Sequence, residues 1–309
     1  MRGETTGGSQ RTDILVTGAT GFIGRALVSA LRARGKTLVA TTRRPAESMN
    51  AIEGVTWRRC DLLAPDTLPA AVAGVRIAYY LVHSMSGGAD HFRQHERRCA
   101  QAFVAAAAAA GVERIIYLGG PAPRGRVSEH LKSRLAVGEI LRAGPVPAIE
   151  LRASMVIGRG SASWQIVRDL AVRLPVMVLP RWLRSRTRPV ALDDAVDALI
   201  AAAELPIERN QWFDIPGPEV LSGRQILERI ADVRGRRFVA IEVPALTPRL
   251  SSLWLKLVTR TDFGLARELV DGLVADLLPK DDRYWGLIGH PVLIDFDDAA
   301  RRALASESR

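Results

Sequence analysis

The sequence contains little cysteine and no long apolar run. Its only cysteines, Cys60 and Cys99, lack the spacing of a metal-ligand set or a disulfide framework. We therefore predict two free thiols, no metal site and a reducing, cytoplasmic location. No segment approaches the roughly 20 apolar residues that a membrane-spanning helix needs, so we expect no membrane partner. Residues 1–12 have no apolar core typical of a signal peptide, and we expect a disordered tail there.

Lysine is also scarce, and arginine carries most of the net charge of +10. The arginine pairs are scattered along the chain, whereas a nucleic-acid-binding face concentrates its charge. We therefore expect no nucleic-acid partner. One dense basic run, residues 181–188 (RWLRSRTR), fits a nucleic-acid or membrane surface. We favour a solvated loop, or a wall that attracts an anionic ligand.

Strand and helix patterns alternate over the first half of the chain. Short apolar, β-branched runs predict parallel strands covered on both faces, and segments with helical spacing lie between them. The predicted strands are 13–17, 37–42, 55–58, 75–82, 114–118 and 148–151, and the predicted helices are 24–34, 65–73, 89–110 and 128–143. This order predicts an α/β Rossmann fold with a doubly wound parallel sheet and right-handed crossovers.

The stretch from Asp13 to Gly24, DILVTGATGFIG, is the strongest motif. It predicts a buried strand, a glycine turn and a helix N-terminus, whose unpaired N–H groups and partial positive charge bind phosphate. Gly18 permits the tight turn, Gly21 lets the backbone approach a pyrophosphate, and Gly24 lets the helix pack close to the strand. In this context the triplet predicts a dinucleotide site, and a glycine-rich turn without a ligand is the alternative.

The second half of the chain has a less regular pattern. We predict a helix at 193–205, a strand at 211–215 and a helix at 223–233 that Ser222 caps. Segment 247–278 has apolar residues at mostly helical spacing, and we favour a lid over a substrate pocket over a membrane-lying helix. The expected domains are therefore an NAD(P)-binding Rossmann domain (13–155), whose sheet later elements continue, and a smaller C-terminal substrate-binding lobe (156–309) interleaved with it.

Several segments together resemble the short-chain dehydrogenase/reductase superfamily, in its extended and atypical branch. The spacing TGxxGxxG is typical of that superfamily, and within it the chain resembles the NAD(P)H-binding NmrA-like and YbjT-like group. The segments that carry the resemblance are 79–85 (YYLVHSM), 114–120 (RIIYLGG), 128–134 (SEHLKSR), 150–153 (ELRA) and 174–177 (LPVM). YbjT-like relatives often continue into a DUF2867-type domain, and we expect this chain to correspond to the nucleotide-binding part alone.

The resemblance implies a set of cofactor contacts. The pyrophosphate loop would consist of Gly18, Thr20, Gly21, Phe22, Ile23 and Gly24. Asp61, followed by Leu62, would accept a hydrogen bond from the adenine amino group, and a helix cap is its alternative role. Leu81 and Val82 would pass under the cofactor.

Arg43 decides which dinucleotide we predict. Folds that select NAD place an acidic residue about 20 residues after the glycines, and at that distance from Gly24 this chain has Arg43. A guanidinium binds a 2′-phosphate in bidentate fashion, whereas a carboxylate repels it. We therefore predict NADP(H), with Arg43 as the main contact and Arg44 as a second one. Two surface arginines without a ligand are the alternative.

The catalytic residues of the superfamily do not carry over. A Tyr exchanges a proton with the substrate there, and a Lys four residues later supports it, but the register here places His130 and Arg134 at these positions. Arg134 can hold the ribose hydroxyls, but its pKa, above about 12, prevents proton relay. His130 suits general acid or base catalysis, and a helix-surface histidine is the alternative. His83 and Ser84 follow a strand end, where the ligands of such sheets gather. Either residue can bind the substrate, and the alternative is that they are loop residues that hydrogen-bond to the backbone.

Three functions remain open at this point. The first is an NADP(H)-dependent oxidoreductase acting on a small apolar carbonyl or activated alkene substrate without a Tyr-x-x-x-Lys pair. The second is a non-catalytic NADP(H)-sensing regulatory protein, as NmrA-like proteins are. The third is a redox-neutral isomerase or cyclase on the same scaffold. We expect a small-molecule substrate and either a monomer or a homodimer.

Overall fold

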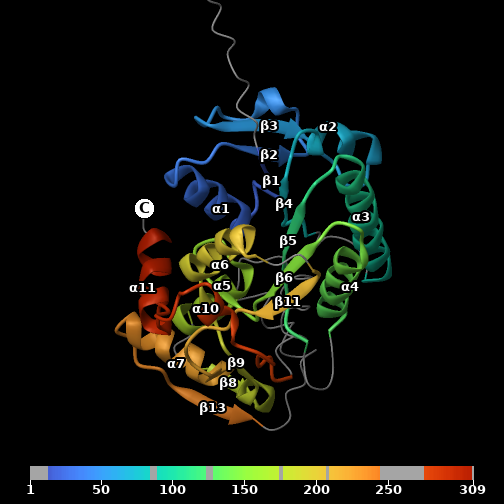
Figure 1. The fold of residues 1–309 in the computed structure, drawn as a ribbon. Coiled ribbons are helices and arrows are strands. Elements are labelled where there is room, and N and C mark those ends of the chain that lie inside the picture. Colours follow the sequence, from blue (N-terminus) through green and yellow to red (C-terminus); the bar gives the residue numbers. More distant parts are fainter. Residues whose placement is uncertain are drawn as a thin grey trace, which may run out of the picture.

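A seven-stranded sheet forms the centre of the molecule (Figure 1). The computed structural model describes residues 13–83, 89–122, 128–173, 177–206, 209–243 and 275–307. The strand order is β3-β2-β1-β4-β5-β6-β11, and every neighbouring pair is parallel. The strands are β1 (Ile14–Val16), β2 (Leu38–Thr42), β3 (Val55–Arg59), β4 (Ile77–Tyr80), β5 (Arg114–Gly119), β6 (Ala148–Arg152) and β11 (Gln211–Asp214). The predicted Rossmann fold is confirmed.

Helices cover both faces of this sheet (Figure 1). Both faces of the sheet are apolar, because successive side chains of a strand point to opposite sides. In β1, Ile14 and Val16 enter one core and Leu15 enters the other. The first face carries α1 (Phe22–Ala33) and α6 (Leu192–Glu204), and the second carries α2 (Leu68–Val72), α3 (Ala89–Ala109) and α4 (Glu129–Ala143).

Elements after β6 build a second hydrophobic core beside the sheet. Its helices are α5 (Ala162–Arg173), α7 (Gly223–Val233) and α11 (Phe296–Glu307). Three short strand pairs accompany them: β7 (Val156–Ile157) with β10 (Val190–Ala191), β9 (Arg186–Thr187) with β12 (Leu221–Ser222), and β8 (Met177–Pro180) with β13 (Ala240–Val243). A further short helix, α10, spans Tyr284–Leu287. The predicted domain boundary at residue 155 stays a prediction. Although α6 and β11 follow this boundary in the sequence, they belong to the layers of the central sheet.

The local signals for helix ends agree with the structure. Ser128 precedes α4 and accepts a hydrogen bond from the N–H of Leu131, and Ser222 forms a capping box with Gln225 at the start of α7. The single helix predicted over 65–73 was wrong. A 3₁₀ turn, Pro65–Thr67, precedes α2, because proline at position 69 has no N–H to donate to the carbonyl four residues earlier.

The sequence analysis did not predict α5 and α11, which supply much of the second core. The predicted tail 1–12 and nearly all of the predicted lid segment 247–278 lie outside the described residues. Among the helices in the described ranges, none is both long enough and apolar enough to cross a bilayer.

A buried ion cluster fixes α4 against β6. Glu150 has a side chain that is 1% exposed and accepts hydrogen bonds from the Nε atoms of Arg142 (2.8 Å) and Arg152 (3.0 Å). The Arg152 guanidinium also lies over the Trp212 ring, 4.3 Å from its centroid. Gly138 of α4 leaves room for this carboxylate, because a Cβ there would stand 2.5 Å from the Glu150 carboxyl carbon. The cluster therefore sets the distance between α4 and the sheet.

We predict that Glu150→Gln lowers the free energy of unfolding by about 3 kcal/mol, because it leaves two guanidinium groups beside an uncharged partner. Urea denaturation measures the loss. Asp298→Asn, which removes a carboxylate paired with Arg301 on the surface, serves as the control and should cost at most about 1 kcal/mol. Equal losses in the two variants would contradict the role of the cluster.

Candidate active site

The glycine loop after β1 is closely packed on the end of β4. Gly18 has a φ of +65°, and a Cβ there would lie 2.6 Å from the carbonyl oxygen of Leu81. A Cβ on Gly24 would lie 2.2 Å from the Gly18 carbonyl oxygen. Gly21 is the N-cap of α1, where no side chain caps the helix and the first turn holds no acidic residue. The positive end of the α1 dipole is therefore available to an anion, as a pyrophosphate requires.

Thr17 joins the carboxyl ends of β1 and β4. Its buried hydroxyl donates to the carbonyl of Tyr79 (2.9 Å) and accepts from the N–H of Leu81 (3.1 Å). The order of the sheet reverses direction at this pair of strands, and open α/β sheets bind their ligands at such a switch point. The predicted contacts Leu81 and Val82 thus border the glycine loop.

Arg25 is a cation beside the loop that the sequence analysis did not select. Its guanidinium turns back and donates to the carbonyl of Thr20 at 2.8 Å. Nothing in the motif marks this residue, because the contact depends on the direction of a long side chain on α1.

The predicted adenosine-side residues lie after β2 and β3. Arg43 and Arg44 are both exposed, and the N–H of Arg44 donates to the Thr42 hydroxyl at 3.1 Å. Asp61 accepts from the N–H of Leu63 at 3.1 Å in a local turn, and the next helical element begins only at Pro65, so the helix cap considered as its alternative role is not formed. Leu62 is buried in the core on the α3 face, so its side chain points away from a ligand at the loop.

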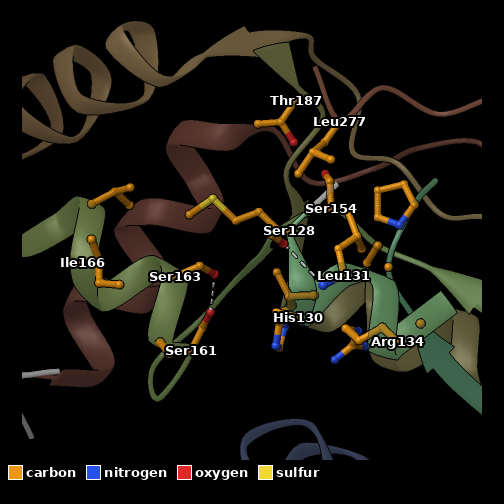
Figure 2. A pocket seen from close by; sticks show the side chains of 18 of the residues that line it. Ser128, His130, Leu131, Arg134, Ser154, Ser161, Ser163, Ile166, Thr187 and Leu277 are labelled. Atoms are coloured by element: carbon orange, nitrogen blue, oxygen red, sulfur yellow. Dashed lines mark hydrogen bonds between the residues drawn. The ribbon is translucent and has the colours of Figure 1, made fainter. Parts of the chain in front are cut away.

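A pocket of about 410 Å³ lies beside the first turn of α1, which contributes Phe22 and Ile23 to its wall. Figure 2 shows other side chains that line this pocket, among them Ser128, His130 and Arg134. The end of β5, the start of α4 and parts of α5, β9 and α7 complete the lining. Most of the wall is apolar, including Leu131, Met155 and Ile166, and several hydroxyl groups interrupt it. These hydroxyl groups belong to Ser128, Ser154, Ser161, Ser163, Ser185 and Thr187.

The structure brings His83, His130 and Arg134 together in this pocket. Ser128 caps the start of α4. His130 and Arg134 are four residues apart on this helix, which is about one turn, so they lie on the same face. Figure 2 shows their side chains pointing the same way. The imidazole rings of His83 and His130 meet edge to face with centroids 4.6 Å apart. Ser84, the fourth predicted catalytic residue, lies outside the described residues.

Arg134 is held by the end of β5. Its guanidinium donates to the carbonyl of Leu118, and its own carbonyl accepts from the Tyr117 hydroxyl at 3.2 Å. The guanidinium carbon lies 6.0 Å from the centroid of the Tyr117 ring. A cation therefore stands at a defined place in the pocket.

The sequence analysis missed a buried carboxylate behind the histidines. Glu96 of α3 is 5% exposed and lies 2.8 Å from Nδ1 of His83. The hydroxyl of Ser133, on α4, donates to the other oxygen of Glu96 at 2.6 Å. No local pattern singles out this acid, because it stands in a polar stretch of a long helix and only packing shows that it is buried.

Burial lowers the pKa of both histidines. It lowers the pKa of His130 to about 2, and the charges of His83 and Arg134 act in the same direction. Burial also lowers the pKa of His83, where the hydrogen bond to Glu96 partly opposes the shift. A neutral imidazole donates through one nitrogen and accepts through the other. Among the described residues, no group of three His, Cys, Asp or Glu side chains is arranged to hold a metal ion.

The chain is similar in sequence to known proteins. A family model described as NAD(P)H-binding matches residues 18–169, which contain the glycine loop, His83, His130 and Arg134. A protein of Caulobacter vibrioides named ceramide reductase is 28% identical over 270 residues, covering 83% of this chain and 84% of that protein.

Solved structures agree with the fold. A nucleoside-diphosphate-sugar epimerase of Staphylococcus aureus has a TM-score of 0.75 at 14% identity, covering 94% of this chain and 99% of that one. The Bordetella bronchiseptica enzyme WbmH, solved in complex with NAD⁺, has a TM-score of 0.72 at 12% identity, covering 96% and 98%. At these identities the likeness concerns the fold alone.

The glycine loop, the parallel sheet that holds it and the matching family model lead to one conclusion. The chain carries an NAD(P)H-binding domain on a Rossmann fold.

Proposed function

We propose that this protein is an NADP(H)-dependent reductase of a carbonyl group in an amphipathic, ceramide-like substrate. One observation carries the proposal: a largely apolar pocket adjoins the glycine loop and contains His83, His130 and Arg134. The similarity to a protein named ceramide reductase supports both the reaction and the substrate class.

The residues after β1 and β2 fit the dinucleotide. The uncapped N-terminus of α1 suits the pyrophosphate, with Gly18 and Gly24 keeping the loop close to the backbone. Arg43 suits a 2′-phosphate, since it is exposed just beyond β2 and no side chain among the described residues pairs with it. When bound, the reduced nicotinamide supplies a hydride to an electrophilic carbon. The protein binds, orients and polarises the substrate.

The pocket suits a substrate with both apolar and polar parts. Leu131, Met155 and Ile166 offer an apolar wall, whereas Ser154 and Thr187 bring hydroxyl groups into it. The Thr187 hydroxyl is fully buried and finds no hydrogen-bond partner in the described part of the chain. An unsatisfied buried hydroxyl costs free energy, and an amide or hydroxyl group of the substrate would satisfy it. A ceramide-like lipid combines these two characters.

The substituted histidine and arginine serve polarisation rather than the usual proton relay. A neutral His130 donates an N–H hydrogen bond to the substrate oxygen without carrying a full charge. Arg134, held by the Leu118 carbonyl, adds a fixed positive charge beside it. Together they stabilise the negative charge that develops on oxygen during reduction.

A substrate panel tests the proposal directly. The purified chain is incubated with deuterium-labelled NADPH and a long-chain ketone bearing an amide, a long-chain ketone without one, a short ketone and a nucleoside-diphosphate-sugar. We expect deuterium transfer, followed by mass spectrometry, with kcat/KM at least tenfold higher for the keto amide than for the short ketone. Tight NADPH binding without transfer to any acceptor would instead favour the non-catalytic NADP(H) sensor.

The choice of cofactor rests on Arg43. We predict that Arg43→Ala weakens NADPH binding about tenfold or more, since a charged hydrogen bond to phosphate contributes about 1.5–3 kcal/mol, and leaves NADH binding nearly unchanged. Isothermal titration with both cofactors measures the two affinities. Arg234→Ala, at the exposed C-terminal end of α7, is the matched control. An unchanged preference for NADPH in Arg43→Ala would refute the assignment.

The neutral state of His130 makes stability depend on pH. Its pKa is lower in the folded protein than in the unfolded chain, so the unfolded state binds the extra proton and acid favours unfolding. Between pH 6.5 and 5 we expect His130 to account for about 1–2 kcal/mol of lost stability. His130→Gln should therefore show a shallower acid decline in urea denaturation, and its curve should run parallel to that of the wild type above pH 7.5. Parallel curves throughout would show that burial does not depress this pKa.

A further inference from the structure

We infer that His83 is the proton donor of the proposed reductase, and that Glu96, held by Ser133, is the residue that positions it. The inference rests on the proposed function and names the donor that the missing Tyr-x-x-x-Lys pair leaves open.

Three separate elements converge on the Glu96 carboxylate. Glu96 comes from α3, His83 follows β4, and Ser133 lies on α4 one turn after His130. Oε1 of Glu96 lies 2.8 Å from His83 Nδ1, and Oε2 accepts the Ser133 hydroxyl at 2.6 Å. A buried carboxylate is costly unless hydrogen bonds compensate it. Both oxygens of Glu96 have a hydrogen-bond partner, and one of these partners, His83, can change its protonation state.

This geometry defines which nitrogen of His83 exchanges a proton. An ionised carboxylate only accepts hydrogen bonds, so the Nδ1 of His83 carries a hydrogen toward Glu96. The proton exchanged with a substrate is then carried on Nε2. His83 lines the pocket with 18% of its side chain exposed, but Nε2 itself is buried. A substrate oxygen therefore reaches Nε2 only when neighbouring side chains, among them the His130 ring 4.6 Å away, move aside. A carboxylate that holds the far nitrogen of an imidazole and stabilises its charged form is the role of the acid in Ser-His-Asp triads.

The surrounding charges favour His83 over His130 as the donor. The charged groups that face His83 are Glu96 from α3 and Arg134 from α4, with His130 of α4 as its titratable neighbour. Glu96 favours the imidazolium form of His83, while Arg134 opposes it. His130 has His83 and Arg134 as its charged neighbours, and both oppose its protonation. His130 therefore orients the substrate oxygen, and His83 protonates it.

The proposed step balances with NADPH as the reductant. The carbonyl carbon gains the hydride, the π electron pair of the C=O bond moves to oxygen, and that oxygen takes the proton from Nε2 of His83. An alcohol results, and His83 becomes neutral while its Nδ1–H stays bonded to Glu96. Water then restores the proton. Because only the protonated ring can act, kcat/KM should fall as the pH rises through the pKa of His83.

Glu96→Gln tests the pair, because it keeps the shape of the side chain and removes its charge. We expect a loss of kcat of about tenfold or more at pH 7 with little change in KM, and a pH profile displaced to lower pH. His83→Gln should lower kcat about 100-fold. Glu96→Asp should recover part of the activity. Ser133→Ala should cost less than Glu96→Gln. The NADPH affinity and the urea denaturation curve of each variant are measured as well, so that kcat is compared only between proteins that are folded and bind the cofactor.

A second readout does not depend on turnover. Histidine side-chain ¹⁵N NMR of the chain without cofactor should show His83 as the Nδ1–H tautomer, with His83→Gln identifying its signals. Glu96→Gln should lower the pKa of His83 in the same spectra. The inference about His83 and Glu96 would be overturned, with the proposed function intact, by one combination of results. In it the wild type reduces the keto amide, and Glu96→Gln has the same kcat, pH profile and His83 pKa as the wild type. A wild type that reduces nothing would overturn the proposed function, and the donor role with it.

Discussion

The close approach of Gly18 to the end of β4 is the constraint on which the site depends. The Gly18 backbone lies where a Cβ would meet the Leu81 carbonyl, and the Thr17 hydroxyl bonds both to Tyr79 and to Leu81. This contact aligns the α1 N-terminus with the residues that follow β4. His83 comes two residues after Leu81, so the contact that shapes the phosphate loop also brings His83 to the pocket.

The second half of the site is built on α4. The Ser128 cap sets where this helix begins, and the Glu150 ion cluster sets how far it stands from the sheet. His130 and Arg134 therefore reach the pocket from a rigid element rather than from a loop. The contact between α3 and α4 brings the Glu96 carboxylate next to His83, which is the pair of residues on which the proposed proton transfer depends.

Local patterns predicted the Rossmann half well. The apolar run before Thr17, the glycine spacing and the Ser128 cap are short-range signals, and each corresponds to the expected element. The C-terminal half was predicted less completely, and the capping signals of two helices were missed. Ser161 accepts a hydrogen bond from the N–H of Trp164 at the start of α5, and Asp295 accepts one from the N–H of Asp298 at the start of α11. Both helices also pack against α7. Propensity is a weak guide where tertiary burial decides.

By itself, the sequence determined the fold class and the glycine loop, and it placed His130 and Arg134 one helical turn apart. These features depend on residues close together in the chain. Only the tertiary structure decided that Glu96 is buried beside His83, that Arg25 returns to the loop, and that Thr187 joins the pocket wall. Each of these depends on elements distant in sequence, whose side chains meet only after the sheet and its helices have packed.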